Sequence, residues 1–136
     1  MILTSVAATA FYASLNAFIL LWLTGATGRA RGRYKVSIGD GGQPYLIRVM
    51  RGHANAIEAI PVFLVMLALA ALLGAPLMAI HGLGIPFTIG RVLHAWHFIQ
   101  EDAPRWQRGA GFGLSFLAFL LLALGLLAHS VMLMAA

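Results

Sequence analysis

The sequence predicts an all-α integral membrane protein, a four-helix bundle, on the basis of three observations. Of the 136 residues, 61% are hydrophobic and only 10% are charged, a composition typical of membrane proteins. Every charged side chain falls in one of two windows, residues 29–58 and 91–108. The apolar sequence around these windows has room for four spans of about 20 residues with short connections. No boundary divides the chain, so we expect a single transmembrane domain over residues 1–136.

Polar, turn-forming sequence separates the first two expected spans. The first covers about residues 3–23 and is expected to end at the helix-breaking run 24–28, which contains two glycines. A loop of about 20 residues should follow. The second span, about residues 45–73, begins after Pro44, because proline is favoured at the start of a helix.

A short turn and a polar loop define the last two spans. The run 74–76 is too short for anything but a tight turn, so the third span, about residues 77–99, should pack antiparallel to the second. The segment 100–107 is polar and contains Pro104, which indicates a loop. The fourth span then covers about residues 108–134.

The basic residues predict the orientation of the bundle. Four spans place both termini on one side of the membrane and the first and third loops on the other. Most of the nine Lys and Arg residues lie in or next to these two loops, and such residues gather on the cytoplasmic side. We therefore expect cytoplasmic charged loops and non-cytoplasmic termini. The net charge of +5 then reflects topology, and nucleic-acid binding is not expected.

Polar side chains continue from the first loop into the second span. Four of them are spaced by three, four and three residues and so share one face of a helix: Arg48, Arg51, Asn55 and Glu58. This stripe is about 15 Å long. Charges within a membrane are costly, so the stripe indicates a functional site. His53 points to roughly the opposite face and is expected to meet a different neighbour.

The third span carries a matching set. Four residues again share one face: Arg91, His94, Phe98 and Glu101. Counted outward from the tight turn, Glu58 and Arg91 lie at the same depth, about 25 Å from it. We expect these two residues to form an ion pair, which by itself can simply join two helices.

Pairing Glu58 with Arg91 leaves Arg48 and Arg51 without a counter-charge, and this excess predicts an anionic ligand. A metal site is not expected, because the spacing of His53, His94 and His97 does not place three ligands on one face. The absence of cysteine excludes a disulfide framework and a cysteine nucleophile.

The run from Arg48 to Phe63 fits the pattern R-x-x-R-x-x-x-N-x-x-E-x-x-P-x-F, and Gly90-Arg-Val-Leu-His94 adds a second motif. Together they resemble the signatures of the MAPEG family, the membrane-associated proteins in eicosanoid and glutathione metabolism. The resemblance covers essentially the whole chain and is strongest to the family's bacterial branch. It implies a subunit of a homotrimer in a bacterial inner membrane, with glutathione as co-substrate at the subunit interfaces near the cytoplasmic side.

The resemblance also implies roles for individual residues. Those similar to glutathione contacts are Arg51, Asn55, Glu58, Arg91 and His94. Arg48 is expected to help Arg51 hold the carboxylates, while Arg31 and His53 are expected to reach the site of an adjacent subunit. Arg105 or Arg108 matches the family's catalytic arginine, and Arg105 has the better spacing from Arg91. Ala59 and Phe98 stand where glutathione-binding relatives have tyrosine, so two hydrogen bonds to the peptide are missing.

The resulting hypothesis is a glutathione-dependent transferase or peroxidase that acts on lipophilic electrophiles or lipid hydroperoxides. These hydrophobic substrates would arrive from the lipid bilayer. The alternative is a non-catalytic lipid-binding or helper protein on the same scaffold. The two missing tyrosines favour this alternative slightly, whereas the presence of Arg105 and Arg108 argues against it. A small transporter is a third class, but it should carry charge to both sides of the membrane, and here one side has none.

Overall fold

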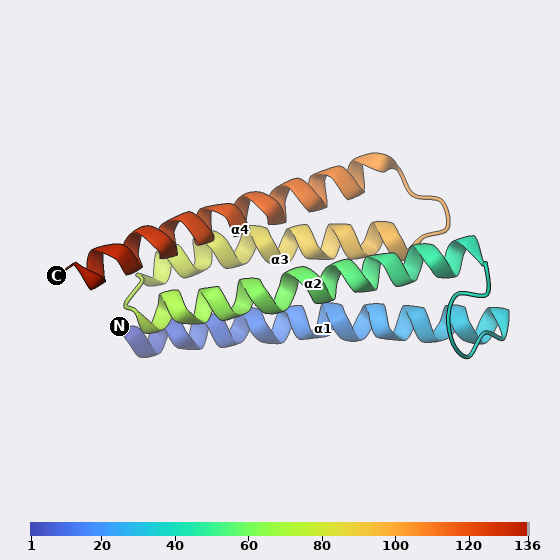
Figure 1. Ribbon diagram of the computed structural model, residues 1–136, viewed down its shortest axis with the longest axis horizontal. Helices are drawn as coiled ribbons and strands as arrows, with labels where there is room; N and C mark the ends of the chain where they lie inside the picture. Colours follow the sequence, from blue (N-terminus) through green and yellow to red (C-terminus); the bar gives the residue numbers. More distant parts are fainter. Residues whose placement is uncertain (136) are drawn as a thin grey trace.

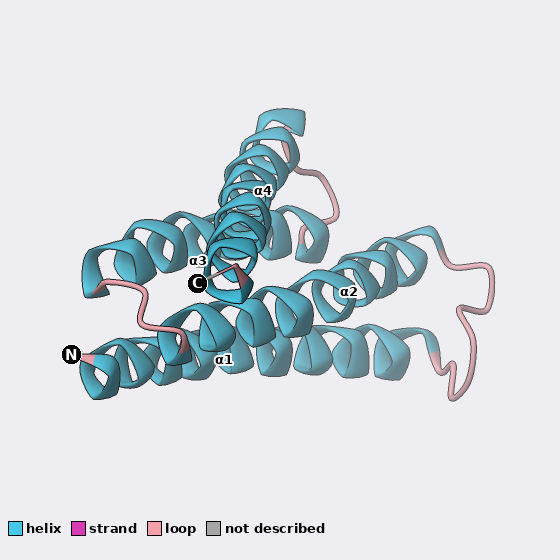
Figure 2. Ribbon diagram, turned by 60° about the vertical axis from the view of Figure 1, so that its left-hand side comes forward, coloured by secondary structure: helices cyan, strands magenta, loops and turns pink. Residues whose placement is uncertain are grey.

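The computed structural model describes residues 1–135, so Ala136 of the expected domain lies outside the described residues. The described chain forms four α-helices: α1 (Ile2–Tyr34), α2 (Pro44–Leu72), α3 (Leu77–Ile99) and α4 (Arg105–Met134). They run lengthwise beside one another, with both termini and the α2–α3 turn at one end of the bundle and the two longer loops at the other (Figure 1; Figure 2).

The lengths of the helices suit a membrane. By length and composition, α1, α2 and α4 can each cross a bilayer. Helix α3 has 23 residues and is long enough, but Arg91, His94 and His97 make its second half polar. The all-α four-helix architecture predicted from the sequence is therefore present, with three of the helices apolar enough to count as spans.

The expected end of the first helix is wrong. Helix α1 continues through the run 24–28 and ends only at Tyr34, so the first loop shortens to residues 35–43. The hydroxyls of Thr24 and Thr27 donate to the carbonyls of Leu20 and Leu23, one turn earlier, so neither needs a partner outside the helix. The helix stops at Lys35, which is left-handed (φ 55°) and whose N–H bonds to the carbonyls of the preceding turn.

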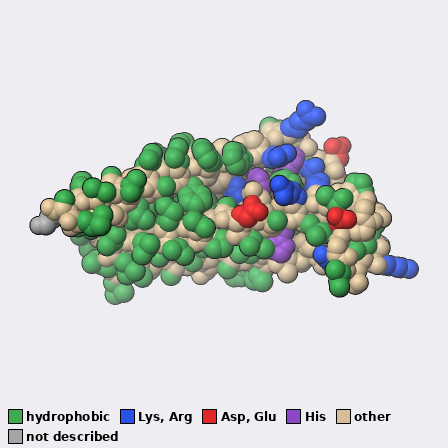
Figure 3. Space-filling model, viewed as in Figure 1, with side chains coloured by type: hydrophobic (Ala, Val, Ile, Leu, Met, Phe, Trp, Pro, Cys, Tyr) green, Lys and Arg blue, Asp and Glu red, His purple; other side chains and the backbone are tan. Residues whose placement is uncertain are grey.

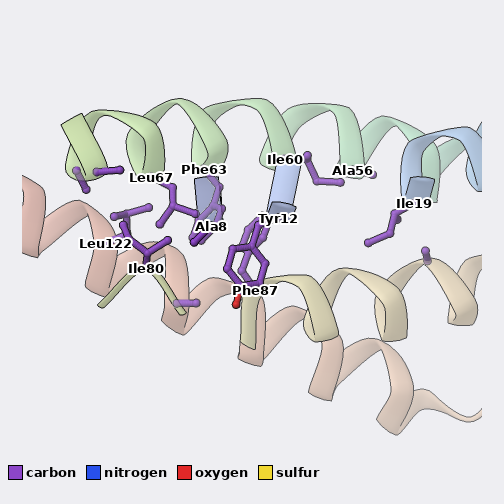
Figure 4. Packing of buried hydrophobic residues seen from close by; sticks show 14 of the residues in the cluster. Ala8, Tyr12, Ile19, Ala56, Ile60, Phe63, Leu67, Ile80, Phe87 and Leu122 are labelled. Atoms are coloured by element: carbon purple, nitrogen blue, oxygen red, sulfur yellow. The ribbon is translucent and has the colours of Figure 1, made fainter. Parts of the chain in front are cut away.

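Stacked aromatic rings fill the centre of the bundle. The rings of Phe63 on α2 and Phe87 on α3 are parallel, with centroids 3.6 Å apart, and Phe119 of α4 meets both edge-on. Leu67, Ile80 and other fully buried aliphatic side chains continue this core toward the α2–α3 turn (Figure 4). This apolar half fixes how the polar ends of α2, α3 and α4 face one another.

Hydrogen bonds join α1 to α3 across the apolar region. The Tyr12 hydroxyl lies 2.7 Å from Nδ1 of His81, and Asn16 Nδ2 donates to Thr88 Oγ1 over 2.9 Å. Gly84 makes room for the Tyr12 ring, since a Cβ at this position would lie 2.5 Å from it. Polar side chains of this kind hold membrane helices together, so α1 is fixed against α3 along much of its length.

Candidate functional site

A cavity of about 650 Å³ lies between the polar ends of α2, α3 and α4. Its lining residues belong to the end of the molecule where the charged side chains gather, and Figure 3 shows this gathering of charge. Its volume is within the range of small-molecule sites, roughly 300–1,000 Å³. The polar residues that line it come from all three helices: Arg48, Arg51, Asn55, His94, His97, Arg105 and Arg108.

Arg91 lies just behind this cavity, buried and held by neutral groups. Its Nη1 donates to Asn55 Oδ1 (2.9 Å) and its Nη2 donates to Ser115 Oγ (2.6 Å), while its Nε is buried and makes no hydrogen bond within the described residues. The expected ion pair between Glu58 and Arg91 is absent, because Glu58 lies on the exposed surface of α2. The α2 residue that bonds to Arg91 is instead Asn55, one helical turn before Glu58.

The bond to Arg91 fixes the orientation of the Asn55 amide. An arginine can only donate hydrogen bonds, so the amide oxygen of Asn55 must face the guanidinium. The Asn55 side chain also lines the cavity. Its NH₂ group therefore remains as a donor for an acceptor within the cavity, such as a carboxylate.

A chain of hydrogen bonds fixes the start of α4. Arg48 Nη2 donates to both Nε2 (2.9 Å) and the carbonyl (2.8 Å) of His97, and His97 Nδ1 lies 3.2 Å from the Pro104 carbonyl. Since Nε2 accepts from Arg48, the ring proton must be on Nδ1, where it donates to Pro104. Pro104 immediately precedes α4, so Arg48 acts through His97 on the position of Arg105.

Phe98 provides an aromatic wall between two arginines. Its ring centroid is 5.8 Å from the guanidinium carbon of Arg48 and 5.7 Å from that of Arg108, distances that allow cation–π attraction. Gly52 on α2 leaves the space that Phe98 occupies, since a Cβ at position 52 would lie 2.4 Å from Phe98 Cβ. Phe98 thus helps to orient two of the four arginines that line the cavity, Arg48 and Arg108.

Backbone contact holds α4 tightly against α3. A Cβ on Gly90 would lie 2.7 Å from the Gly111 carbonyl oxygen, and a Cβ on Gly111 would lie 2.6 Å from the His94 nitrogen. Two glycines at the crossing therefore let the two backbones touch. Because of this contact, His94 of α3 and Arg108 of α4 line the same cavity.

The cavity is strongly cationic. Four arginines line it, Arg91 lies behind it, and none of its lining residues is acidic. Within residues 1–135 the ion pair that forms, Arg33 with Glu101, lies on the exposed surface instead. Arg51, Arg105 and Arg108 are exposed and have no carboxylate partner within the described residues, so the geometry favours an anionic ligand.

The structure brings together most of the residues that the sequence indicated; Arg91 lies directly behind the cavity, and three others lie away from it. Arg31 donates to the Ser37 carbonyl, His53 lies 3.3 Å from Thr24 Oγ1 on the α1 side, and Glu58 is exposed. Sequence reasoning missed the roles of His97 and Ser115. Ser115 had a visible signal, because it is the one polar side chain in the stretch 109–128 of α4, whereas nothing in the sequence paired His97 with Arg48.

Comparisons with known proteins agree with this architecture. The MAPEG family matches residues 9–128. The chain is also 34% identical over 116 residues to the inner membrane protein YecN of Escherichia coli strain K12, covering 85% of this chain and 87% of that protein. YecN of Escherichia coli O6:H1 strain CFT073 matches equally well. With its four helices and arginine-lined cavity, the chain is a membrane protein that belongs to the MAPEG family.

Proposed function

We propose that this protein is a glutathione-dependent membrane transferase or peroxidase that acts on lipophilic electrophiles or lipid hydroperoxides. The observation that carries the proposal is the cluster of guanidinium groups around a cavity with no acidic lining residue. Glutathione has two carboxylates, one ammonium and one thiol. It therefore supplies the anionic charge that this cavity lacks.

The cavity offers donors for the glutathione carboxylates. Arg51 is exposed to the cavity and is free of carboxylate partners within the described chain, so its planar fork can bind a carboxylate through two hydrogen bonds. The Asn55 NH₂ group adds a neutral donor. Arg48 is already engaged by His97, so its contribution is to the charge and shape of the site.

Arg105 is our first choice for activating the thiol. A free thiol has a pKa of about 8.5, so most of it is protonated at neutral pH. A guanidinium beside the sulfur favours the thiolate, which then attacks an electrophilic carbon as the leaving group departs with its electron pair. With a hydroperoxide, two glutathione molecules are oxidised to the disulfide while the peroxide is reduced to an alcohol and water. Arg108, one turn further along α4, is the second candidate.

We further propose that the protein works as a homotrimer in the inner membrane, with cytoplasmic loops. Arg31, His53 and Glu58 lie outside the cavity of their own chain, which agrees with roles in an adjacent subunit's site, where Glu58 would receive the glutathione ammonium. We expect native mass spectrometry of the detergent-solubilised protein to give a particle of three times 14.5 kDa. A monomer that still binds glutathione at full affinity would contradict the shared site.

The proposed function is tested by blocking the carboxylates of the ligand. We expect glutathione diethyl ester to bind at least about tenfold more weakly than glutathione, because hydrogen bonds to charged groups contribute about 1.5–3 kcal/mol each. S-methyl glutathione, which keeps both carboxylates, is the matched control and should bind about as well as glutathione. Isothermal titration calorimetry measures all three. Equal binding of the ester would contradict the carboxylate contacts, and no binding of glutathione would favour the non-catalytic alternative.

A further inference from the structure

A second feature of the molecule lies along the seam between α1 and α3, away from the arginine-lined cavity. An apolar groove of about 410 Å³ runs between the two helices, lined by Leu15, Phe18, Ile19, Trp22, Thr88 and Val92. Phe18 and Val92 are exposed, so the groove is open to the surroundings of the bundle. A bilayer would place acyl chains against such a surface.

A smaller, basic pocket of about 200 Å³ continues this seam toward the charged end of the molecule. It is lined by Ala26, Arg29, Ala30, Arg33, Tyr45 and Ile99. The buried alanines, Ala26 and Ala30, form its floor, and the Tyr45 hydroxyl donates to the Ile99 carbonyl at its edge. The alanine side chains are small and therefore leave space, and the two arginines make this space suited to an anionic group.

The two depressions lie on one face of α1. The residues that line them follow one another at intervals of three or four, from Leu15 and Trp22 in the groove to Ala26 and Arg29 in the pocket, which is the spacing of a single helix face. Arg29 lies fourteen positions after Leu15, a length of about 21 Å at 1.5 Å per residue. This length is comparable to one bilayer leaflet, about half of a 40–45 Å membrane.

Arg29 supplies the charge of this site. Its side chain is exposed, and within residues 1–135 it has no carboxylate partner. The Arg29 side chain folds back along α1 in the direction of the groove. Its Nη1 atom is so close to Gly25, one turn earlier, that a Cβ added to this glycine would lie 3.3 Å from it. Arg33, one turn later, is paired with Glu101 and lies near the Tyr45 ring. A cation at the end of an apolar groove is the complement of a lipid with an anionic headgroup.

We propose that the α1–α3 seam binds one anionic phospholipid, with its phosphate at Arg29 and an acyl chain along the apolar groove. The second cation, Arg33, contributes to the headgroup site when it exchanges Glu101 for the lipid phosphate. The site is separate from the glutathione cavity, and the proposal does not depend on catalysis.

Trp22 lines the groove and reports its occupant directly. The full-length protein with Trp96→Phe and Trp106→Phe retains Trp22 as its single tryptophan. It is reconstituted in bilayers that contain phosphatidylglycerol or phosphatidylcholine with brominated acyl chains, and fluorescence quenching gives the relative association constants. We expect phosphatidylglycerol to be preferred about fivefold, since a basic residue near an anionic lipid contributes about that factor.

Variants of Arg29 separate a specific site from general surface charge. Arg29→Gln should abolish the preference, Arg29→Lys should retain most of it, and Lys35→Gln, which removes one charge outside the pocket, should leave it unchanged. Equal quenching by the two lipids would overturn the proposal, as would equal effects of Arg29→Gln and Lys35→Gln. Absence of quenching by either lipid would also overturn it and would indicate that a second copy of the chain covers the groove.

Discussion

Replacing Arg105 by alanine is expected to lower the rate of glutathione conjugation about 100-fold, the loss typical when one electrostatic stabiliser is removed from an active site. Glutathione should still bind, because Arg51 and Asn55 remain to contact its carboxylates. The ultraviolet absorbance of the thiolate, followed by stopped flow, should disappear at neutral pH. Without the guanidinium the pKa of the bound thiol returns toward about 8.5, so activity should recover as the pH rises toward that value.

Arg108→Ala is the matched control for Arg105→Ala. Both arginines line the cavity from α4, but the Arg108 guanidinium lies against the Phe98 ring. We expect Arg108→Ala to weaken binding a few-fold without removing the thiolate signal. Loss of that signal in Arg108→Ala alone would assign activation to Arg108 and contradict the role of Arg105. A wild-type protein that binds glutathione without forming thiolate would favour a non-catalytic function.

The helices were largely predictable because apolar length is a strong signal, and the residues of α3 coincide with the expected third segment, 77–99. The end of α1, at Tyr34, was not predictable in this way. Glycine and threonine in the run 24–28 read as a helix break, yet an isolated glycine costs a helix only about 1 kcal/mol. Threonine hydroxyls can also bond within the helix, as Thr24 and Thr27 do. Composition alone cannot distinguish this arrangement from a loop.

Helical spacing predicted the arginines of α2 that line the cavity, because spacing determines which residues share a face. It did not predict the partner of Arg91. Counting depth from a turn treats two helices as straight and parallel, and a shift of one turn replaces Glu58 by Asn55 opposite Arg91. The link from Arg48 through His97 to Pro104 depends on how three elements meet, which a linear pattern does not encode.

Gly111→Ala is expected to destabilise the bundle by about 1–3 kcal/mol, the usual cost of overpacking. The added methyl group would lie 2.6 Å from the His94 nitrogen and 2.8 Å from the Gly90 carbonyl oxygen. Both are backbone atoms and cannot rotate away, so α3 and α4 must separate. The midpoint of thermal unfolding in detergent should fall. Glutathione affinity should fall with it, because His94 and Arg108 move apart.

Gly113→Ala is the control, and it is expected to shift the unfolding midpoint in the opposite direction. Gly113 lies two residues further along the same helix, is exposed, and has nothing within 4 Å of its would-be Cβ. Alanine there should raise the unfolding midpoint slightly, since alanine stabilises a helix interior by about 0.5–1 kcal/mol relative to glycine. Opposite shifts in the two variants would show that the α3–α4 contact, rather than helix propensity, determines the effect. Equal stabilisation by both substitutions would mean that the two backbones do not touch at Gly111, and that the cavity between them has a different shape.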